Sequence, residues 1–100
     1  MAYAEQMGSS APIWIVPDPQ IVDEITDYDR QTFHVYAALL DLDDVGESWQ
    51  HAARDVLQID PDAEPTRAER MHRAHLERAR WMVRVGWPRL LNDWKRKQRR

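Results

Sequence analysis

The sequence predicts one long amphipathic helix in the C-terminal third of the chain. It opens with Thr66 followed three positions later by Glu69, a pattern in which the two side chains cap a helix start reciprocally. Gly86 and Pro88 predict its end, because glycine often closes helices and proline cannot continue them. A helix from residue 66 to about residue 85 is about 28 Å long at 1.5 Å per residue. The rest of a 100-residue chain must pack around such an element.

On a helical wheel, this segment separates into an apolar face and a charged face. The predicted core face holds Ala68, Met71, His72, His75, Leu76, Ala79, Met82, Val83 and Gly86. The opposite face carries Arg70, Arg73, Glu77, Arg80 and Arg84 at spacings of three and four. Trp81 borders the charged face, and an exposed tryptophan beside arginines is typical of a protein-binding surface. Packing of Trp81 against the N-terminal arm or the last helix is the alternative.

The remaining segments predict shorter helices. Asp18 and Pro19 form a start signal for a first helix, with a break expected near residues 27–29. Residues 29–42 continue as a helix, and Ser48 caps another that reaches Ile59. Residues 87–94 begin a last short helix. We therefore expect an all-α fold, a small helix-turn-helix-like bundle of four or five helices with a long basic penultimate helix and flexible termini.

The expected organisation is a flexible arm at residues 1–11, a single helical domain at residues 12–94 and a basic disordered tail at residues 95–100. A set of apolar side chains is expected to form the core of that domain. They are Phe33, Tyr36, Leu40, Trp49, Val56, Leu57, Met71, Leu76, Ala79, Met82 and Leu90.

Charge is distributed unevenly along the chain. Residues 1–65 hold 14 acidic and 2 basic side chains, a balance of −12, whereas residues 66–100 hold 3 acidic and 12 basic ones, a balance of +9. Such polarity indicates an internal attraction, a charged partner or head-to-tail self-association. Two solvated faces that partly neutralise each other are the simpler interpretation.

Several classes of protein are excluded or disfavoured. The chain has no cysteine, so disulfides, thiolate zinc sites and cysteine nucleophiles are excluded. No apolar run has the length of a membrane span, and residues 1–10 lack the features of a signal peptide. We therefore expect a cytoplasmic protein with no membrane partner.

Two groups of residues could suggest a metal site or catalysis. His72 and His75 have a spacing that can share a metal ion, but both lie on the apolar face, so we interpret them as partly buried and hydrogen-bonded. Ser48, His51 and Asp55 are the residue types of a hydrolase triad, but on one short helix their side chains point in different directions. We expect no metal site, no cofactor and no enzymatic activity.

A DNA-binding interpretation uses the same long helix. A capped helix, a loop and a second capped helix match the order of a helix-turn-helix, whose second helix reads bases through its first turns. The residues that would contact nucleic acid are Arg67, Arg70, Arg73, Lys95, Arg96 and Lys97. The acidic residues 1–65 would repel a phosphate backbone, and the loop "DPDAEP" is longer than the usual turn.

Two stretches, "ALLDLDDVGESWQHAARDVLQID" and "RMHRAHLERARWMVRVGWPRLL", resemble a family of small helical regulators from bacterial mobile elements. These are the QseM-type antiactivators of rhizobial integrative and conjugative elements, which share a domain with the C-terminal part of FseA activators. In the family, a basic helix ends in a Gly-Tyr-Arg-x-Leu-Leu-like motif. Here residues 86–91 read Gly-Trp-Pro-Arg-Leu-Leu.

The resemblance covers about two thirds of the chain and implies a helix-turn-helix-related fold used in transcriptional control. It also implies that the chain binds FseA-like activators and LuxR-type TraR quorum-sensing regulators, and so represses excision and conjugative transfer. We expect a monomer. The residues expected to contact the partner protein are Arg67, Arg70, Arg73, Trp81 and Arg84. A DNA-binding transcription factor is the main alternative, and a structural adaptor that assembles through its opposite charges is a third.

Overall fold

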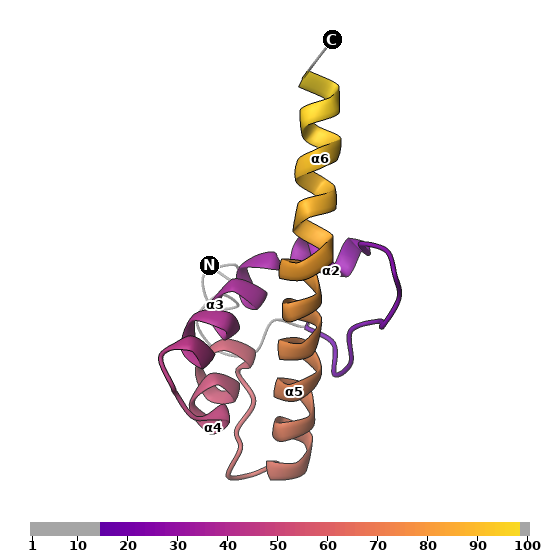
Figure 1. Ribbon diagram of the computed structural model, residues 1–100. Coiled ribbons are helices and arrows are strands. Elements are labelled where there is room, and N and C mark those ends of the chain that lie inside the picture. The colour runs from indigo at the N-terminus through magenta and orange to yellow at the C-terminus, as the bar shows by residue number, and fades with distance from the viewer. Residues whose placement is uncertain (1–14, 99–100) are drawn as a thin grey trace, which may run out of the picture.

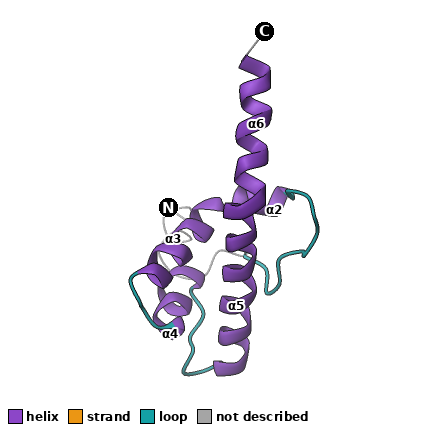
Figure 2. Ribbon diagram, viewed as in Figure 1, coloured by secondary structure: helices purple, strands orange, loops and turns teal. Residues whose placement is uncertain are grey.

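The computed structural model describes residues 15–98, and these form helices and loops without a strand (Figure 2). The elements in chain order are α2 (Asp27–Gln31), α3 (Phe33–Asp44), α4 (Trp49–Ala52), the π-helical turn η1 (Ala53–Leu57), α5 (Pro65–Trp81), the π-helical turn η2 (Met82–Gly86) and α6 (Trp87–Gln98). The predicted all-α class is confirmed for this part of the chain. The predicted arm at residues 1–11 lies outside the described residues.

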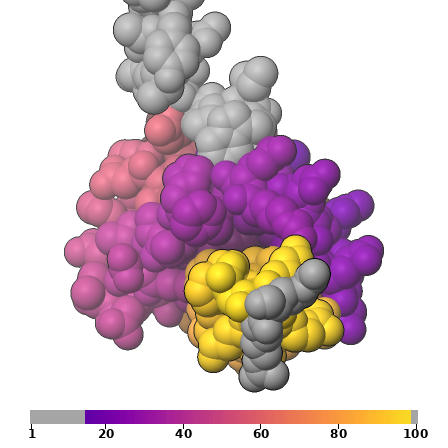
Figure 3. All heavy atoms as spheres, turned by 90° about the horizontal axis from the view of Figure 1, so that it is seen from above, coloured from indigo at the N-terminus to yellow at the C-terminus, as the bar shows by residue number. Residues whose placement is uncertain are grey.

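One helical rod organises the molecule. α5, η2 and α6 follow one another without a break, and α3 and α4 pack on one side of α5 (Figure 1). α6 rises beyond this body, and the view from above shows its yellow end standing over the violet and magenta segments (Figure 3). Among the described residues, no helix is long and apolar enough to cross a membrane.

The expectation that Asp18 and Pro19 open a first helix is wrong, since residues 15–26 form no helix. The backbone carbonyls of this segment bind side chains from the rod instead of amides four residues ahead. Arg78 donates to the carbonyls of Val22 and Glu24 at 2.8 and 2.7 Å. These contacts hold the segment, called the strap below, as an irregular loop against the side of the rod (Figure 1).

The first described helix, α2, begins where a reciprocal cap forms. The Thr26 hydroxyl accepts from the Asp29 amide at 3.1 Å, and the Asp29 carboxylate accepts from the Thr26 amide at 2.9 Å. This arrangement satisfies two backbone donors that a helix start leaves free. α2 therefore starts at Asp27, near the position where the sequence predicts a break.

The capping box predicted at Thr66 is also wrong. Glu64 occupies the capping position of α5, and no side-chain hydrogen bond caps this helix start. Pro65 is the first residue of α5, a position that suits proline because its fixed φ is already helical and its missing amide would have no partner there.

The predicted end of the long helix at Gly86 is wrong as well. η2 forms a wider turn in which the Trp87 amide donates to the Met82 carbonyl five residues back. This local widening accommodates Pro88, whose ring would clash with a carbonyl in a regular helix interior. Gly86 serves close packing, because a Cβ there would lie 2.6 Å from Met82 Sδ.

The helix continues well past this turn. Residues 95–98, expected in a tail without secondary structure, are the last residues of α6, and only residues 99–100 of that tail lie outside the described part. The wider π turn also changes the directions in which its side chains point, and Val83, expected on the core face, is exposed.

The predicted core is largely confirmed. Tyr36, Leu57, Met71, Leu76, Ala79 and Met82 are buried, and Leu40, Trp49, Val56 and Leu90 are half-buried. The expectation that Phe33 lies in the core is wrong, because its side chain is 56% exposed. The face of α3 that meets α5 runs through Val35, Tyr36 and Leu39, and Phe33 lies off that face.

Candidate functional site

A buried ion pair joins α5 to α2. Arg78 Nη2 lies 2.6 Å from Asp29 Oδ2 and Arg78 Nε lies 3.1 Å from Asp29 Oδ1, with side chains 3% and 1% exposed. Two charged nitrogens thus face two carboxylate oxygens, the geometry in which an arginine pairs most strongly with a carboxylate. Together with its bonds to the strap, Arg78 ties α5 to α2 and to residues 22–24.

Asp29 accepts hydrogen bonds from three residues. Besides Arg78 and the Thr26 amide, the Tyr36 hydroxyl donates to Asp29 Oδ1 at 2.8 Å. Burial by itself raises the pKa of this carboxyl, but the hydrogen bonds from Arg78, Thr26 and Tyr36 outweigh it, so the Asp29 pKa lies below its usual value. Burial also raises the pKa of Tyr36, with its hydrogen bond to Asp29 adding to the shift. Asp29 is therefore ionised and fully partnered at neutral pH.

The sequence interpretation missed Arg78, although a signal was present. Its position is three after His75 and four before Met82, on the face assigned to the core. An arginine at that spacing predicts a buried ion pair, because a charge is buried only when it is paired.

A second buried link fastens the strap to α5. His75 Nδ1 lies 2.8 Å from the Met71 carbonyl, which only accepts, so Nδ1 carries the proton and Nε2 accepts from the Tyr28 hydroxyl at 2.7 Å. The Tyr28 hydroxyl in turn accepts from the Val16 amide at 3.1 Å. Burial lowers the pKa of His75, which is therefore neutral at pH 7. This confirms the buried, hydrogen-bonded interpretation of His75; His72 is half-buried.

We expect the free energy of unfolding to fall as the pH drops below about 6.5, the usual histidine value. Below that pH the histidine of the unfolded chain binds a proton, whereas His75 of the folded chain stays neutral down to its lowered pKa. The stabilisation is therefore complete above about pH 6.5 and is lost as the pH falls from there to the lowered pKa of His75. Urea denaturation at several pH values measures this. Burial lowers the pKa of His72 too, so the variant His72→Gln/His75→Gln is the reference. The same pH slope in the variant and the wild type would contradict the prediction.

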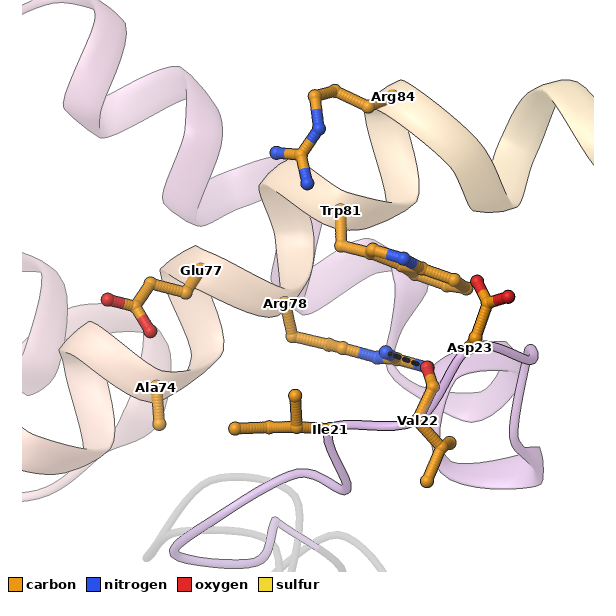
Figure 4. A pocket seen from close by; sticks show the side chains of 8 residues that line it. All are labelled: Ile21, Val22, Asp23, Ala74, Glu77, Arg78, Trp81 and Arg84. Atoms are coloured by element: carbon orange, nitrogen blue, oxygen red, sulfur yellow. Dashed lines mark hydrogen bonds between the residues drawn. The ribbon is translucent and has the colours of Figure 1, made fainter.

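Between the strap and the rod lies an open groove of about 360 Å³. Its lining comprises Ile21, Val22, Asp23, Ala74, Glu77, Arg78, Trp81 and Arg84. Figure 4 shows the Arg78 side chain between the Trp81 indole and Ile21, and the guanidinium carbon lies 3.9 Å from the indole centroid. Such a contact is a favourable cation–π interaction.

Apolar surface and a free cation meet at this groove. Ile21 is 90% exposed, Trp81 is half-buried, and Arg84 forms no ion pair within residues 15–98. Glu77, on the same wall, also forms no ion pair there. Arg84 lies about 10 Å farther along the rod than Glu77. The groove can therefore take an apolar side chain together with a carboxylate at its Arg84 end.

The structure places the predicted protein-binding residues in two groups. Trp81 and Arg84 line the groove, whereas the other three arginines lie toward the start of α5 in exposed ion pairs. Arg67 pairs with Glu64 at 2.9 Å, Arg70 with Asp18 at 3.3 Å and Arg73 with Glu69 at 3.7 Å. The charged face is therefore partly neutralised within the chain.

The residues of the DNA-binding alternative are also divided. Lys95, Arg96 and Lys97 lie on α6, whereas Arg67 lies in the first turn of α5. At 1.5 Å per residue, the two groups are about 40 Å apart along the rod. The structure does not bring them into one patch.

The triad-like residues and the histidines form no reactive constellation. The Ser48 hydroxyl accepts from the His51 amide as a helix cap, and the His51 ring nitrogens face Glu47 at 3.7 Å and Asp55 at 3.0 Å. The His51 ring thus faces carboxylates and not the Ser48 hydroxyl. Within residues 15–98, no group of three or more histidine, aspartate or glutamate side chains could hold a metal ion.

A comparison of the chain with known protein families and with curated proteins found no matching family model and no matching relative.

Proposed function

We propose that the chain is a transcriptional antiactivator, a protein that binds an activator and so keeps its target genes off. The groove beside Trp81 is the observation that supports protein binding, the first part of this proposal. Its lining combines the exposed Ile21 with Trp81, which stacks on Arg78. It also includes Arg84, which forms no ion pair among the described residues. Tryptophan and arginine side chains of this kind dominate binding hot spots.

The proposed partners are FseA-like activators and LuxR-type TraR regulators, and the proposed outcome is repression of excision and conjugative transfer of a mobile element. This identification rests on the sequence resemblance to the QseM-type antiactivators, while the groove supports only protein binding. A partner segment would place an apolar side chain over Ile21 and Trp81 and a carboxylate beside Arg84. Arg67, Arg70 and Arg73 would add rim contacts, because exposed ion pairs are worth only about 0–1 kcal/mol and exchange readily.

Helix-turn-helix DNA binding is the second proposal, and the order of α4–η1, a loop and α5 favours it. The residues that would read bases, Arg67, Arg70 and Arg73, already face carboxylates of this chain. The loop at residues 58–64 adds acidic side chains near the start of α5. This charge distribution disfavours a phosphate backbone, so protein binding is preferred.

The first test is a tagged pull-down from cells that carry the mobile element, with and without nuclease. Antiactivation predicts that a transcription activator is identified and is retained after nuclease. Loss of every partner after nuclease would favour the DNA-binding proposal. A retained activator should also be silenced in a reporter assay when the chain is co-expressed.

Charge reversal in the groove should weaken that complex. We expect Arg84→Glu to reduce affinity for the activator at least tenfold, because a carboxylate beside Arg84 would then meet like charge. Arg73→Glu, in α5 of the same rod, is the matched control and should change affinity less than threefold, because Arg73 contributes only at the rim. Isothermal titration gives both affinities, and circular dichroism checks the folding of each variant. Equal losses in the two variants would assign binding to the whole charged face and not to the groove.

A further inference from the structure

α6 carries an apolar stripe that the described body leaves largely uncovered. Trp87, Leu90, Leu91 and Trp94 recur at the spacing that places them on one side of a helix. Trp87 packs against the cluster of Tyr36, Ala79 and Met82 at the base of the helix. Farther out, Leu91 is 51% and Trp94 is 58% exposed, and no residue of α6 is fully buried. The stripe thus begins at the edge of the core and continues along the part of α6 that rises beyond the body; Figure 1 shows the course of this helix.

Unpaired positive charge borders this stripe on both sides. On a helical wheel, Lys95 falls beside Leu91 and Lys97 falls beside Leu90. Neither lysine forms an ion pair within the part of the chain that the structure describes. The two arginines of α6 lie on the opposite side and are already paired, Arg89 with Asp23 at 2.9 Å and Arg96 with Asp93. The free charges of α6 are therefore the ones that flank its apolar stripe.

We propose that this α6 surface binds a short acidic amphipathic helix of another protein. Apolar side chains of that helix would cover Leu91 and Trp94, and its flanking carboxylates would pair with Lys95 and Lys97. Such packing uses the apolar face of one helix against that of another, with charges at the edges selecting the partner. The surface is separate from the groove at Trp81, so this inference holds whether or not the groove binds an activator.

Other occupants fit the charges less well. A second copy packed stripe to stripe would bring four unpaired lysines together, which like-charge repulsion opposes. An anionic membrane or a nucleic acid would attract the lysines but repel residues 1–65, which carry a balance of −12. An acidic helix needs to contact only α6, which projects away from the body of the fold.

Two designed peptides test the proposal with the full chain. Both are helical 16-residue sequences, about 24 Å long when fully helical, with leucines at spacings of three and four. The residues beside the leucines are glutamates in one peptide and lysines in the other. Fluorescence anisotropy of the labelled peptides should show the glutamate peptide binding at least tenfold more tightly. Lys95→Glu/Lys97→Glu should reverse the preference, and Leu91→Ser/Trp94→Ser should abolish binding of both. These side chains are exposed, so the variants should keep wild-type helicity.

Three outcomes would overturn the inference. One is equal binding of the two peptides or no binding of either. A second is that the chain sediments as a dimer and that Leu91→Ser/Trp94→Ser dissociates this dimer. A third is that the chain binds vesicles of phosphatidylserine and phosphatidylcholine more tightly than it binds the glutamate peptide. Arg84→Glu separates this surface from the groove, because it should leave glutamate-peptide binding within twofold of wild type. Failure of the peptide test would therefore leave the proposed antiactivator function untouched.

Discussion

Replacing Arg78 with methionine is expected to destabilise the protein by about 3–5 kcal/mol, because it leaves the buried carboxylate of Asp29 without its charged partner. The same change removes the donors that hold the carbonyls of Val22 and Glu24, so the strap should detach from α5 as well. A small domain has a total stability of about 5–15 kcal/mol, so this loss removes a large share of it. Urea denaturation followed by circular dichroism measures the loss.

Arg80→Met is the matched control on the same helix. Arg80 Nη2 lies 2.7 Å from Asp43 Oδ2, almost as close as Arg78 lies to Asp29, but the side chains of Arg80 and Asp43 are about half exposed. Water already solvates both charges there, so the control should lose no more than about 1 kcal/mol. If Arg78→Met costs as little as Arg80→Met, the ion pair does not hold the fold together.

A double-mutant cycle separates the ion pair from the other contacts of Arg78. Asp29→Asn alone should also be destabilising, since a neutral amide can no longer balance the buried guanidinium. The double variant Asp29→Asn/Arg78→Met should cost less than the two single changes together, because neither buried charge is then left alone. Additive losses would mean that Arg78 acts mainly through the strap carbonyls.

The all-helical class was predictable because local patterns decide it. Between residues 66 and 82 the apolar side chains recur at the helical period, which places them on one face of a helix. Met71, Leu76 and Ala79 on that face are buried as expected. Ser48 caps α4 as predicted, since the serine contact is made within one turn.

The boundaries that failed depend on contacts far apart in the chain. Asp18 and Pro19 form a good local start signal, but carbonyls only a few residues later bind Arg78, which lies more than fifty residues away. Gly86 and Pro88 form a good local stop signal, but the π turn and the packing of Trp87 on the body let the rod continue. Propensity is a weak prior that tertiary contacts override.

The candidate site was predictable in part for the same reason. Trp81 stood out from composition and position, and it does line a groove. The wheel could not show that the groove's other wall comes from residues 21–23, or that Arg70 would pair with Asp18, which lies 52 residues away. The spacing of Trp87, Leu91 and Trp94 was visible in the sequence, which predicts a last helix from residue 87, and α6 does begin there. The sequence could not show that the outer part of this helix stands clear of the body and leaves Leu91 and Trp94 exposed.

Leu57→Ala is expected to cost about 2–5 kcal/mol, through lost burial and the cavity left behind. The side chain has no exposed surface and belongs to the larger core cluster, with Leu39, Met71 and Leu76. Because the side chain is completely enclosed by that cluster, we expect a loss in the upper half of that range.

Urea denaturation of Leu57→Ala, with Val45→Ala as its control, gives this loss directly. Val45 is 72% exposed at the end of α3, so its truncation should change stability by no more than about 0.5 kcal/mol. Leu57 and Arg78 belong to different packing groups, so the losses of Leu57→Ala and Arg78→Met should add within about 0.5 kcal/mol. The sum, about 6–10 kcal/mol, is a large part of the total stability of a small domain, so the double variant should unfold at a much lower urea concentration than either single variant. A loss below about 1 kcal/mol for Leu57→Ala would mean that α3, η1 and α5 do not enclose this side chain.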